Sequence, residues 1–195
     1  MYDTSMLDFK EYFELHSTIL RNFQGEQNIL NLVNDIENLA QYPDSLIFTV
    51  GNGGSASTAE HFSADLSLME QRTGTQVRSI CLNSSVALNS ALSNDISYET
   101  ALVNQINLYN KFDYLLVTFS ASGNSLNILQ TIELALANKK KVYSFVGFDA
   151  GAMKDIKLLN LIHYYDPLKN YGIAENLQLS ATHYVIELLV KRFRT

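Results

Sequence analysis

Residues 46–57 read LIFTVGNGGSAS, and residues 114–125 read YLLVTFSASGNS. Each stretch is an apolar run followed by a loop of small residues, and each loop leads into a segment with helical periodicity. Apolar runs of five or six residues that alternate with helices are typical of a parallel sheet buried on both faces. We therefore expect an α/β protein, a three-layer sandwich in which a five-stranded parallel sheet is flanked by helices.

The rest of the chain supplies the other elements of this sandwich. Apolar runs predict three further strands, at about 77–81, 142–146 and 161–165. Apolar residues recur at three- and four-residue spacing over the first 40 residues, interrupted at Gly25, and again in the long tail from about residue 174 to 194. We expect a single domain over residues 1–195, with residues 1–42 forming a helical extension used in oligomerisation.

Composition excludes several classes of protein. The chain has 195 residues and a net charge of -6, the opposite balance from a protein that grips a nucleic-acid backbone. Its single cysteine, Cys81, excludes an internal disulfide or a cysteine-based zinc cluster and fits a reducing compartment. No stretch approaches the roughly 20 apolar residues of a membrane span, and MYDTSMLDFKEYF lacks the apolar core of a signal peptide. We expect a cytoplasmic protein that binds neither nucleic acid nor membrane.

The two small-residue loops predict an anion site. Glycines tolerate a positive φ and let a ligand approach the backbone, and free N–H groups at a helix start attract negative charge. Serine hydroxyls would add neutral donors, and neither loop contains a lysine or arginine. This chemistry suits a compact sugar phosphate better than a nucleotide triphosphate with magnesium. The residues concerned are Gly51, Gly53, Gly54, Ser55 and Ser57 in the first loop and Ser120, Ser122, Gly123 and Ser125 in the second.

Five segments, in this order, resemble the phosphoheptose isomerases of the sugar isomerase (SIS) family. They are VGNGGSASTAEHFSADL (50–66), LSNDISYE (92–99), SASGNSLNIL (120–129), GFDAGAMKD (147–155) and NYGIAENLQLSATH (170–183). The resemblance covers most of the chain. It implies a single SIS domain, assembled as a homotetramer with active sites between subunits, that interconverts sedoheptulose 7-phosphate and D-glycero-D-manno-heptose 7-phosphate for lipopolysaccharide or capsule precursors.

The same resemblance implies roles for individual residues. Asp95 would contact the open-chain sugar, and Asp65 and His183 would be the acid–base pair, with Glu175 as a replacement base. Four residues, His61, Asp65, Glu175 and His183, would converge at the reacting end and could hold Zn²⁺ or another divalent ion. Phosphate and neighbouring hydroxyls would be bound by Asn52, Gly53, Ser55, Ser120, Ser122 and Ser125.

Three positions depart from the pattern of this family. Asp65 stands where the better-known enzymes have glutamate, Glu175 where they have glutamine, and Ala121 where they have threonine. The shorter acid changes the reach to a substrate carbon or a metal by about 1 Å, a shift that can cost on the order of a hundredfold in rate. These departures leave open an isomerase of another phosphosugar, and also a non-catalytic SIS protein that senses a sugar phosphate.

Spacing supports a shared site only in part. His61 and Asp65 are four residues apart and so share one face of a helix. Glu175 and His183 are separated by about 12 Å of rise and roughly 80° of rotation on a regular helix. They could meet through long side chains, through a loop position for Glu175, or through contributions from different subunits.

Overall fold

The computed structural model describes residues 7–194 and contains the expected parallel sheet. Its five strands lie in the order β2-β1-β3-β4-β5, and every pairing is parallel. The expectation of a five-stranded α/β sandwich is therefore confirmed. The strands are β1 (Ser45–Gly51), β2 (Ser79–Cys81), β3 (Asp113–Ser120), β4 (Lys141–Val146) and β5 (Asn160–His163).

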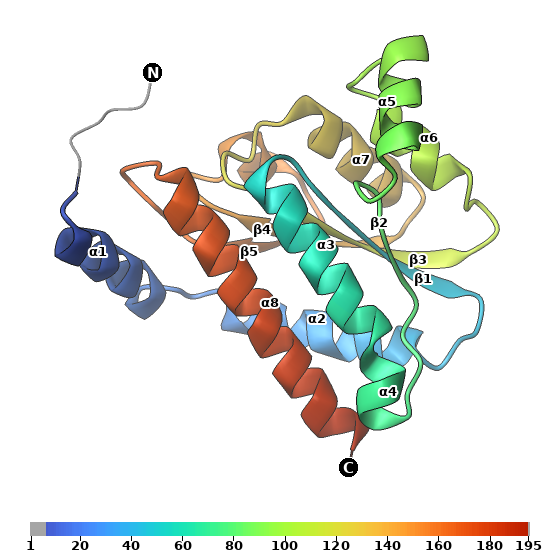
Figure 1. The fold of residues 1–195 in the computed structure, drawn as a ribbon, viewed down its shortest axis with the longest axis horizontal. Coiled ribbons are helices and arrows are strands. Elements are labelled where there is room, and N and C mark those ends of the chain that lie inside the picture. Colours follow the sequence, from blue (N-terminus) through green and yellow to red (C-terminus); the bar gives the residue numbers. More distant parts are fainter. Residues whose placement is uncertain (1–6, 195) are drawn as a thin grey trace.

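Helices cover both faces of the sheet (Figure 1). One face packs against α2, α3 and α8, and the other against α6 and α7. The helices are α1 (Phe9–Arg21), α2 (Glu26–Leu39), α3 (Gly54–Ser67), α4 (Met69–Thr73), α5 (Val86–Asp95), α6 (Ala101–Asn107), α7 (Leu126–Ala137) and α8 (Tyr171–Phe193), with a 3₁₀ helix, η1, at Gly151–Asp155.

Alternating side chains of β1 explain why its sequence is mostly apolar. Leu46, Phe48 and Val50 enter the core beneath α6 and α7, whereas Ile47 enters the core beneath α2, α3 and α8. Successive residues of a strand face opposite sides, so a strand covered on both faces shows no polar alternation. Burial on both faces fixes the sheet in the middle layer of the sandwich.

The ends of several elements differ from those read from the sequence. Strand β2 is limited to three residues, and α8 begins at Tyr171 because the Asn170 side chain accepts a hydrogen bond from the Ile173 N–H at 3.2 Å. Short α4 and the 3₁₀ helix were not expected. Gly25 does separate two N-terminal helices, since it occupies the N-cap of α2.

Register places the two small-residue loops side by side. Strands β1 and β3 are neighbours, with Gly51 paired opposite Phe119, so both strands end at the same edge of the sheet. Ligands of open parallel sheets bind beyond the carboxyl ends of the strands. The candidate site is therefore built at this edge.

Candidate active site

The first loop turns tightly from β1 into α3. A Cβ atom on Gly51 would lie 2.5 Å from the carbonyl carbon and oxygen of Ser55, so the turn leaves no room for a side chain there. Gly53, at the N-cap of α3, has a φ of +57°, a conformation that favours glycine. These two glycines bring the backbone of the loop directly to the start of α3.

The second loop is held by its own serines. Ser120 accepts a hydrogen bond from the Gly123 N–H at 3.0 Å, and Ser122 accepts one from the Asn124 N–H at 3.3 Å. Gly123 has a φ of +68°, and Ser125 is the N-cap residue of α7. Two serines expected to bind phosphate therefore also shape the loop that would receive it.

Both loops line one cavity of about 480 Å³. None of its described lining residues is a lysine or arginine, so any anion bound there would be held by neutral donors. Expected phosphate-binding residues from both loops meet here, together with Glu175. The lining residues are Asn52, Gly53, Ser55, Phe119, Ser120, Ala121, Ser122, Ser125, Tyr171 and Glu175.

Ser55 is tied to helix α8. Its side chain is 3% exposed, and its hydroxyl donates a hydrogen bond to Gln178 Oε1 at 2.9 Å. Gln178 is fully buried and donates in turn to the Phe145 carbonyl at 3.2 Å. This chain joins the start of α3 to α8 and β4, so the first loop cannot shift independently of α8.

Glu175 extends from the first turns of α8 over the start of α3. A Cβ atom on Gly54 would collide with the Glu175 carboxylate, so the glycine is what admits this side chain. Burial raises the pKa of the Glu175 carboxyl above its ordinary value. A carboxyl that resists ionisation can sit in a pocket otherwise suited to anions.

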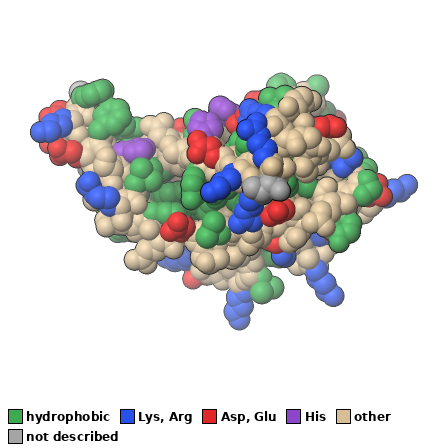
Figure 2. Space-filling view, turned by 90° about the horizontal axis from the view of Figure 1, so that it is seen from below, with side chains coloured by type: hydrophobic (Ala, Val, Ile, Leu, Met, Phe, Trp, Pro, Cys, Tyr) green, Lys and Arg blue, Asp and Glu red, His purple; other side chains and the backbone are tan. Residues whose placement is uncertain are grey.

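Three of the four expected metal-site residues form a second cluster. His61 Nε2 lies 3.4 Å from Asp65 Oδ2 and 3.4 Å from His183 Nε2, and the three ligand atoms lie within 4.8 Å of one another. His61 and Asp65 come from one face of α3, and His183 comes from α8. The two histidines are exposed, and Figure 2 shows histidine, acidic and basic side chains gathered at the surface.

Arg72 holds the carboxylate of this cluster. Its guanidinium donates to Asp65 Oδ1 at 2.7 Å, which leaves Oδ2 toward the histidines. The Arg72 carbonyl accepts two hydrogen bonds from the Arg194 guanidinium, at 3.2 and 2.9 Å. The end of α8 therefore fixes the residue that orients Asp65.

The donor set and two of its three spacings fit a tetrahedral ion. Ligand atoms bound at about 2.1 Å around such an ion are roughly 3.4 Å apart, and histidine with carboxylate is a donor set that Zn²⁺ accepts. The two separations from His61 equal this value, and the third, between Asp65 and His183, lies within 4.8 Å. His61, Asp65 and His183 can thus supply three ligands and leave a fourth position for another group.

Two expected residues lie elsewhere. Glu175 lies in the loop cavity, two helical turns of α8 before His183, and is not among the three residues that cluster. Because α8 is already regular at Glu175, a loop position does not explain how the two residues would meet. Asp95 is the exposed last residue of α5; its carboxylate accepts from the Asn94 amide at 2.9 Å, and it does not line the cavity.

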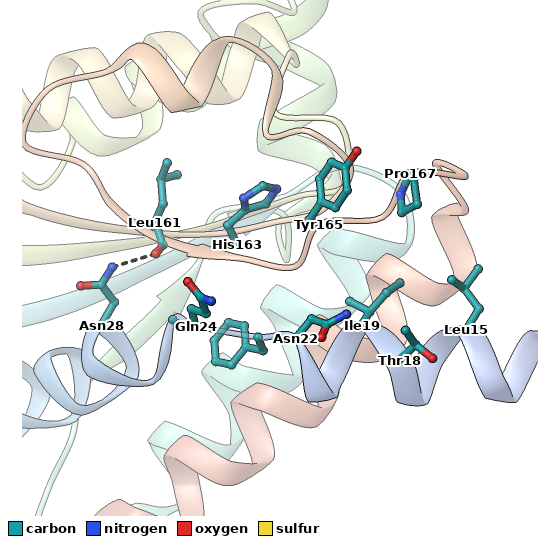
Figure 3. Close-up of a pocket in the computed structure, with 12 residues that line it drawn as sticks. Leu15, Thr18, Ile19, Asn22, Gln24, Asn28, Leu161, His163, Tyr165 and Pro167 are labelled. Atoms are coloured by element: carbon teal, nitrogen blue, oxygen red, sulfur yellow. Dashed lines mark hydrogen bonds between the residues drawn. The ribbon is translucent and has the colours of Figure 1, made fainter.

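A further cavity, of about 540 Å³, lies beside the edge strand β5 (Figure 3). It is bordered by the end of α1, the connection to α2 and residues of β5, and Asn28 donates to the Leu161 carbonyl at 2.8 Å across it. His163 lines this cavity, and its Nε2 lies 3.0 Å from the Phe148 carbonyl oxygen. None of the expected site residues borders it.

Sequence reasoning did not assign a supporting role to the residues that hold the site residues in place. Gln178, Asn127 and Arg72 hold Ser55, Asn52 and Asp65, respectively. Asn127 had one sequence signal, its position two residues after the second loop, in the first turn of the following helix. Gln178 lies 123 positions from Ser55, whereas Arg72 is only seven positions from Asp65 but outside α3.

These observations define a class: an α/β protein with a pocket of neutral polar side chains at the carboxyl edge of its sheet and a histidine–carboxylate cluster beside it. Residues 11–147 match the SIS domain family. The chain belongs to this family. None of the helices described between residues 7 and 194 has the length and apolar character needed to cross a lipid bilayer.

Curated relatives of this chain are named phosphoheptose isomerases, and a solved structure shares the fold. The phosphoheptose isomerase of Helicobacter pylori is 31% identical over 158 residues, covering 78% of this chain and 80% of the relative. That of Shewanella pealeana is 31% identical over 137 residues, or 70% of each chain. The structure of a phosphoheptose isomerase from Francisella tularensis shares the fold, with a TM-score of 0.82, 18% identity and 94% of both chains covered.

Proposed function

We propose that this chain is a phosphoheptose isomerase that interconverts sedoheptulose 7-phosphate and D-glycero-D-manno-heptose 7-phosphate. The observation that carries the proposal is the pairing of α3 with α8. The two helices run side by side in the same direction (Figure 1), with Gly54 against Glu175 at one end and His61 against His183 further along. The proposed anion pocket and the reactive cluster therefore lie along one seam, the line of contact between α3 and α8.

The length of this seam suits a seven-carbon sugar phosphate. His61 lies seven positions after Gly54 on α3, and His183 lies eight positions after Glu175 on α8. These separations correspond to about 10–12 Å of helix. With C–C bonds of about 1.5 Å, an extended heptose with its phosphate ester spans roughly 10 Å from phosphorus to C1. A sugar anchored by its phosphate at the serine loops would bring C1 and C2 to the histidines.

The chemistry needs a base, an acid and a stabiliser of negative charge. A base removes a proton from C1 of the ketose to give an enediol, and the proton returns to C2 to give the aldose. We assign Asp65 and His183 as the acid–base pair, because imidazole and carboxylate groups can both transfer protons and the two lie in the same cluster. Glu175 lies at the phosphate end, in the loop pocket, so we propose it as the replacement base only if another subunit supplies it to the cluster.

A metal ion would fit the same cluster. We assign His61, Asp65 and His183 as its ligands in one chain and propose that Glu175 completes the set only if another subunit supplies it. When bound, Zn²⁺ would supply Lewis-acid stabilisation of the carbonyl and enediol oxygens. Chelation followed by metal and activity assays tests this; full activity in a metal-free sample removes the ion from the mechanism.

Assembly and cellular role complete the proposal. Residues 1–42 are proposed to build a homotetramer, because α1 extends from the body with Phe9 82% and Phe13 52% exposed, and hydrophobic side chains gather at that end of the molecule (Figures 1 and 2). The cavity beside β5 would lie within this assembly. We place the enzyme in the cytoplasm, in the synthesis of surface-polysaccharide precursors.

One experiment tests the reaction itself. Purified protein is incubated with sedoheptulose 7-phosphate, and formation of the aldose is followed by NMR, beside the variant His183→Ala. We expect turnover that the substitution abolishes. Binding of the ketose phosphate without turnover would instead support a non-catalytic sensor, and turnover of a different phosphosugar would support another isomerase.

A further inference from the structure

A buried amide behind the anion pocket links the two loops. Asn127, in the first turn of α7, is 3% exposed. Its Nδ2 donates to Asn52 Oδ1 at 3.0 Å, and its Oδ1 accepts from Asn52 Nδ2 at 2.9 Å. This reciprocal pair joins the loop after β1 to the helix that follows the loop after β3. The inference that follows rests on the proposed function of this pocket as the phosphate site.

The orientation of both amides is set by one backbone group. The Ile128 N–H donates to Asn127 Oδ1 at 3.0 Å. A backbone N–H can only donate, so the atom facing it must be the oxygen of Asn127. The Asn127 nitrogen then donates to Asn52, so the atom of Asn52 that faces it must be the side-chain oxygen. The polarity of the pair therefore follows from the start of α7 and not from the ligand.

Tyr98 occupies the remaining lone pair of the Asn52 oxygen. It lies in the connection between α5 and α6, is 56% exposed, and its hydroxyl donates to Asn52 Oδ1 at 3.1 Å. A carbonyl oxygen accepts two hydrogen bonds, so both positions on Asn52 Oδ1 are filled. Its Nδ2 has donated only one of its two hydrogens. Asn52 lines the cavity, so the group it has left for an occupant is a donor.

We propose that Asn127 and Tyr98 are positioning residues for the phosphate group of the substrate and that both act through Asn52. By filling its oxygen, they make the Asn52 side chain a pure N–H donor toward the pocket. This matters because the described lining of the pocket includes no lysine or arginine, so each neutral donor carries a large part of the recognition. An Asn52 free to turn would present its oxygen to an anion for part of the time.

Tyr98→Phe tests the proposal without endangering the fold, because it removes only a hydroxyl from a largely exposed ring. The affinity for inorganic phosphate is measured by titration calorimetry or ³¹P NMR. Losing one hydrogen bond of ordinary strength corresponds to about a three- to tenfold weaker Kd. Tyr42→Phe, at a position 63% exposed and outside the pocket, is the matched control and should leave the Kd unchanged.

Making the same substitution in a protein that lacks the Asn52 side chain shows whether Tyr98 positions Asn52 or contacts the anion directly. In the Asn52→Ala protein, we expect Tyr98→Phe to have no further effect, because the residue through which it acts is gone. An equal loss in both backgrounds would show that Tyr98 contacts the anion itself and would overturn the positioning role. Asn127→Leu should weaken phosphate binding at least as much as Tyr98→Phe; if this buried change unfolds the chain, Tyr98→Phe decides alone.

Kinetics distinguish this proposal from the assigned reaction. With sedoheptulose 7-phosphate, Tyr98→Phe should raise KM by the same factor as the phosphate Kd and leave kcat within about twofold, since the reacting end is untouched. An unchanged KM and Kd refute the inference while the isomerase assignment stands. The opposite outcome is also possible to distinguish. If the wild type binds phosphate, Tyr98→Phe binds it more weakly, and neither turns over heptose phosphate, the isomerase assignment is refuted while the inference stands.

Discussion

The loop pocket and the histidine cluster are built in opposite ways. In the pocket, the side chains of Ser55 and Ser120 are nearly fully buried and already engaged with a buried amide or with backbone. In the cluster, the side chain of His61 is 49% exposed, and the carboxylate it faces is held by a single ion pair with Arg72. The comparison teaches that the side chains of the proposed binding end are held within the chain itself, while the proposed reactive end leaves ligand positions open for substrate, metal or a second subunit.

The largest expected effect is at the exposed cluster. His183→Ala should lower kcat about 10²- to 10⁴-fold, because it removes a proton-transfer group. The Kd for inorganic phosphate should not change, since His183 does not line the loop pocket. Steady-state kinetics and a phosphate titration on the same preparation check both halves. A substantial loss of phosphate affinity would mean that the two regions are not separate.

The second effect tests how rigid the pocket is. Gly51→Ala should lower the free energy of unfolding by about 2–4 kcal/mol, because the new Cβ would meet the Ser55 backbone, which cannot move without shifting α3. Chemical denaturation measures the change. Gly74→Ala is the control: Gly74 has a φ of +83° but open space around its Cβ, so only the roughly 1 kcal/mol cost of its backbone conformation applies. Equal losses in the two variants would contradict the close packing described for the first loop.

A third, smaller effect concerns the ion pair behind Asp65. Arg72→Met should weaken zinc binding about tenfold, because a partner that orients a ligating carboxylate is lost. Competition with a chromogenic chelator gives the zinc affinity. Arg78→Met, which removes a cation bonded to Gln76, is the control and should bind zinc as the wild type does. If both arginine variants behave alike, Asp65 is not oriented by Arg72.

The smallest effect is a pH dependence at the pocket. Burial raises the pKa of the Glu175 carboxyl in the folded state, so ionisation is less favourable there than in the unfolded chain. Wild-type stability is then fully present below the ordinary carboxyl pKa and is partly lost as the pH rises through the folded value. Glu175→Gln should therefore be more stable than wild type near pH 7, with the difference shrinking toward pH 4. Urea unfolding in chelator at both pH values measures it; a difference that grows toward low pH has the wrong sign.

The fold could be predicted because its signals are local. The strand runs 46–50 and 114–119 are continuous and apolar, and each is followed by glycine and serine where a strand must turn into a helix. Parallel pairing then places both loops at one edge, as the register of Gly51 with Phe119 confirms. Local patterns of this kind survive packing because burial on both faces and turn geometry demand the same residues.

The site was less predictable because it depends on contacts between distant segments. His61 and Asp65 could be paired from their spacing alone, whereas the contact of His183 with His61 joins residues 122 positions apart. Glu175 could not be placed, since its eight-residue separation from His183 was compatible with several arrangements. The structure puts it against Gly54, a contact that the periodicity of the sequence does not predict.

The pairing of α3 with α8 also sets the distance between the proposed phosphate site and the proposed reactive cluster, and this distance can change by a large step or a small one. One turn of helix advances about 5.4 Å, the length of several sugar carbons, so moving a reactive group by a turn would skip whole substrate classes. One methylene changes reach by about 1 Å, close to the advance of a single carbon along an extended chain. Asp65 is shorter than glutamate by that one group. The residue at this position can therefore set selectivity between sugar phosphates that differ by one carbon.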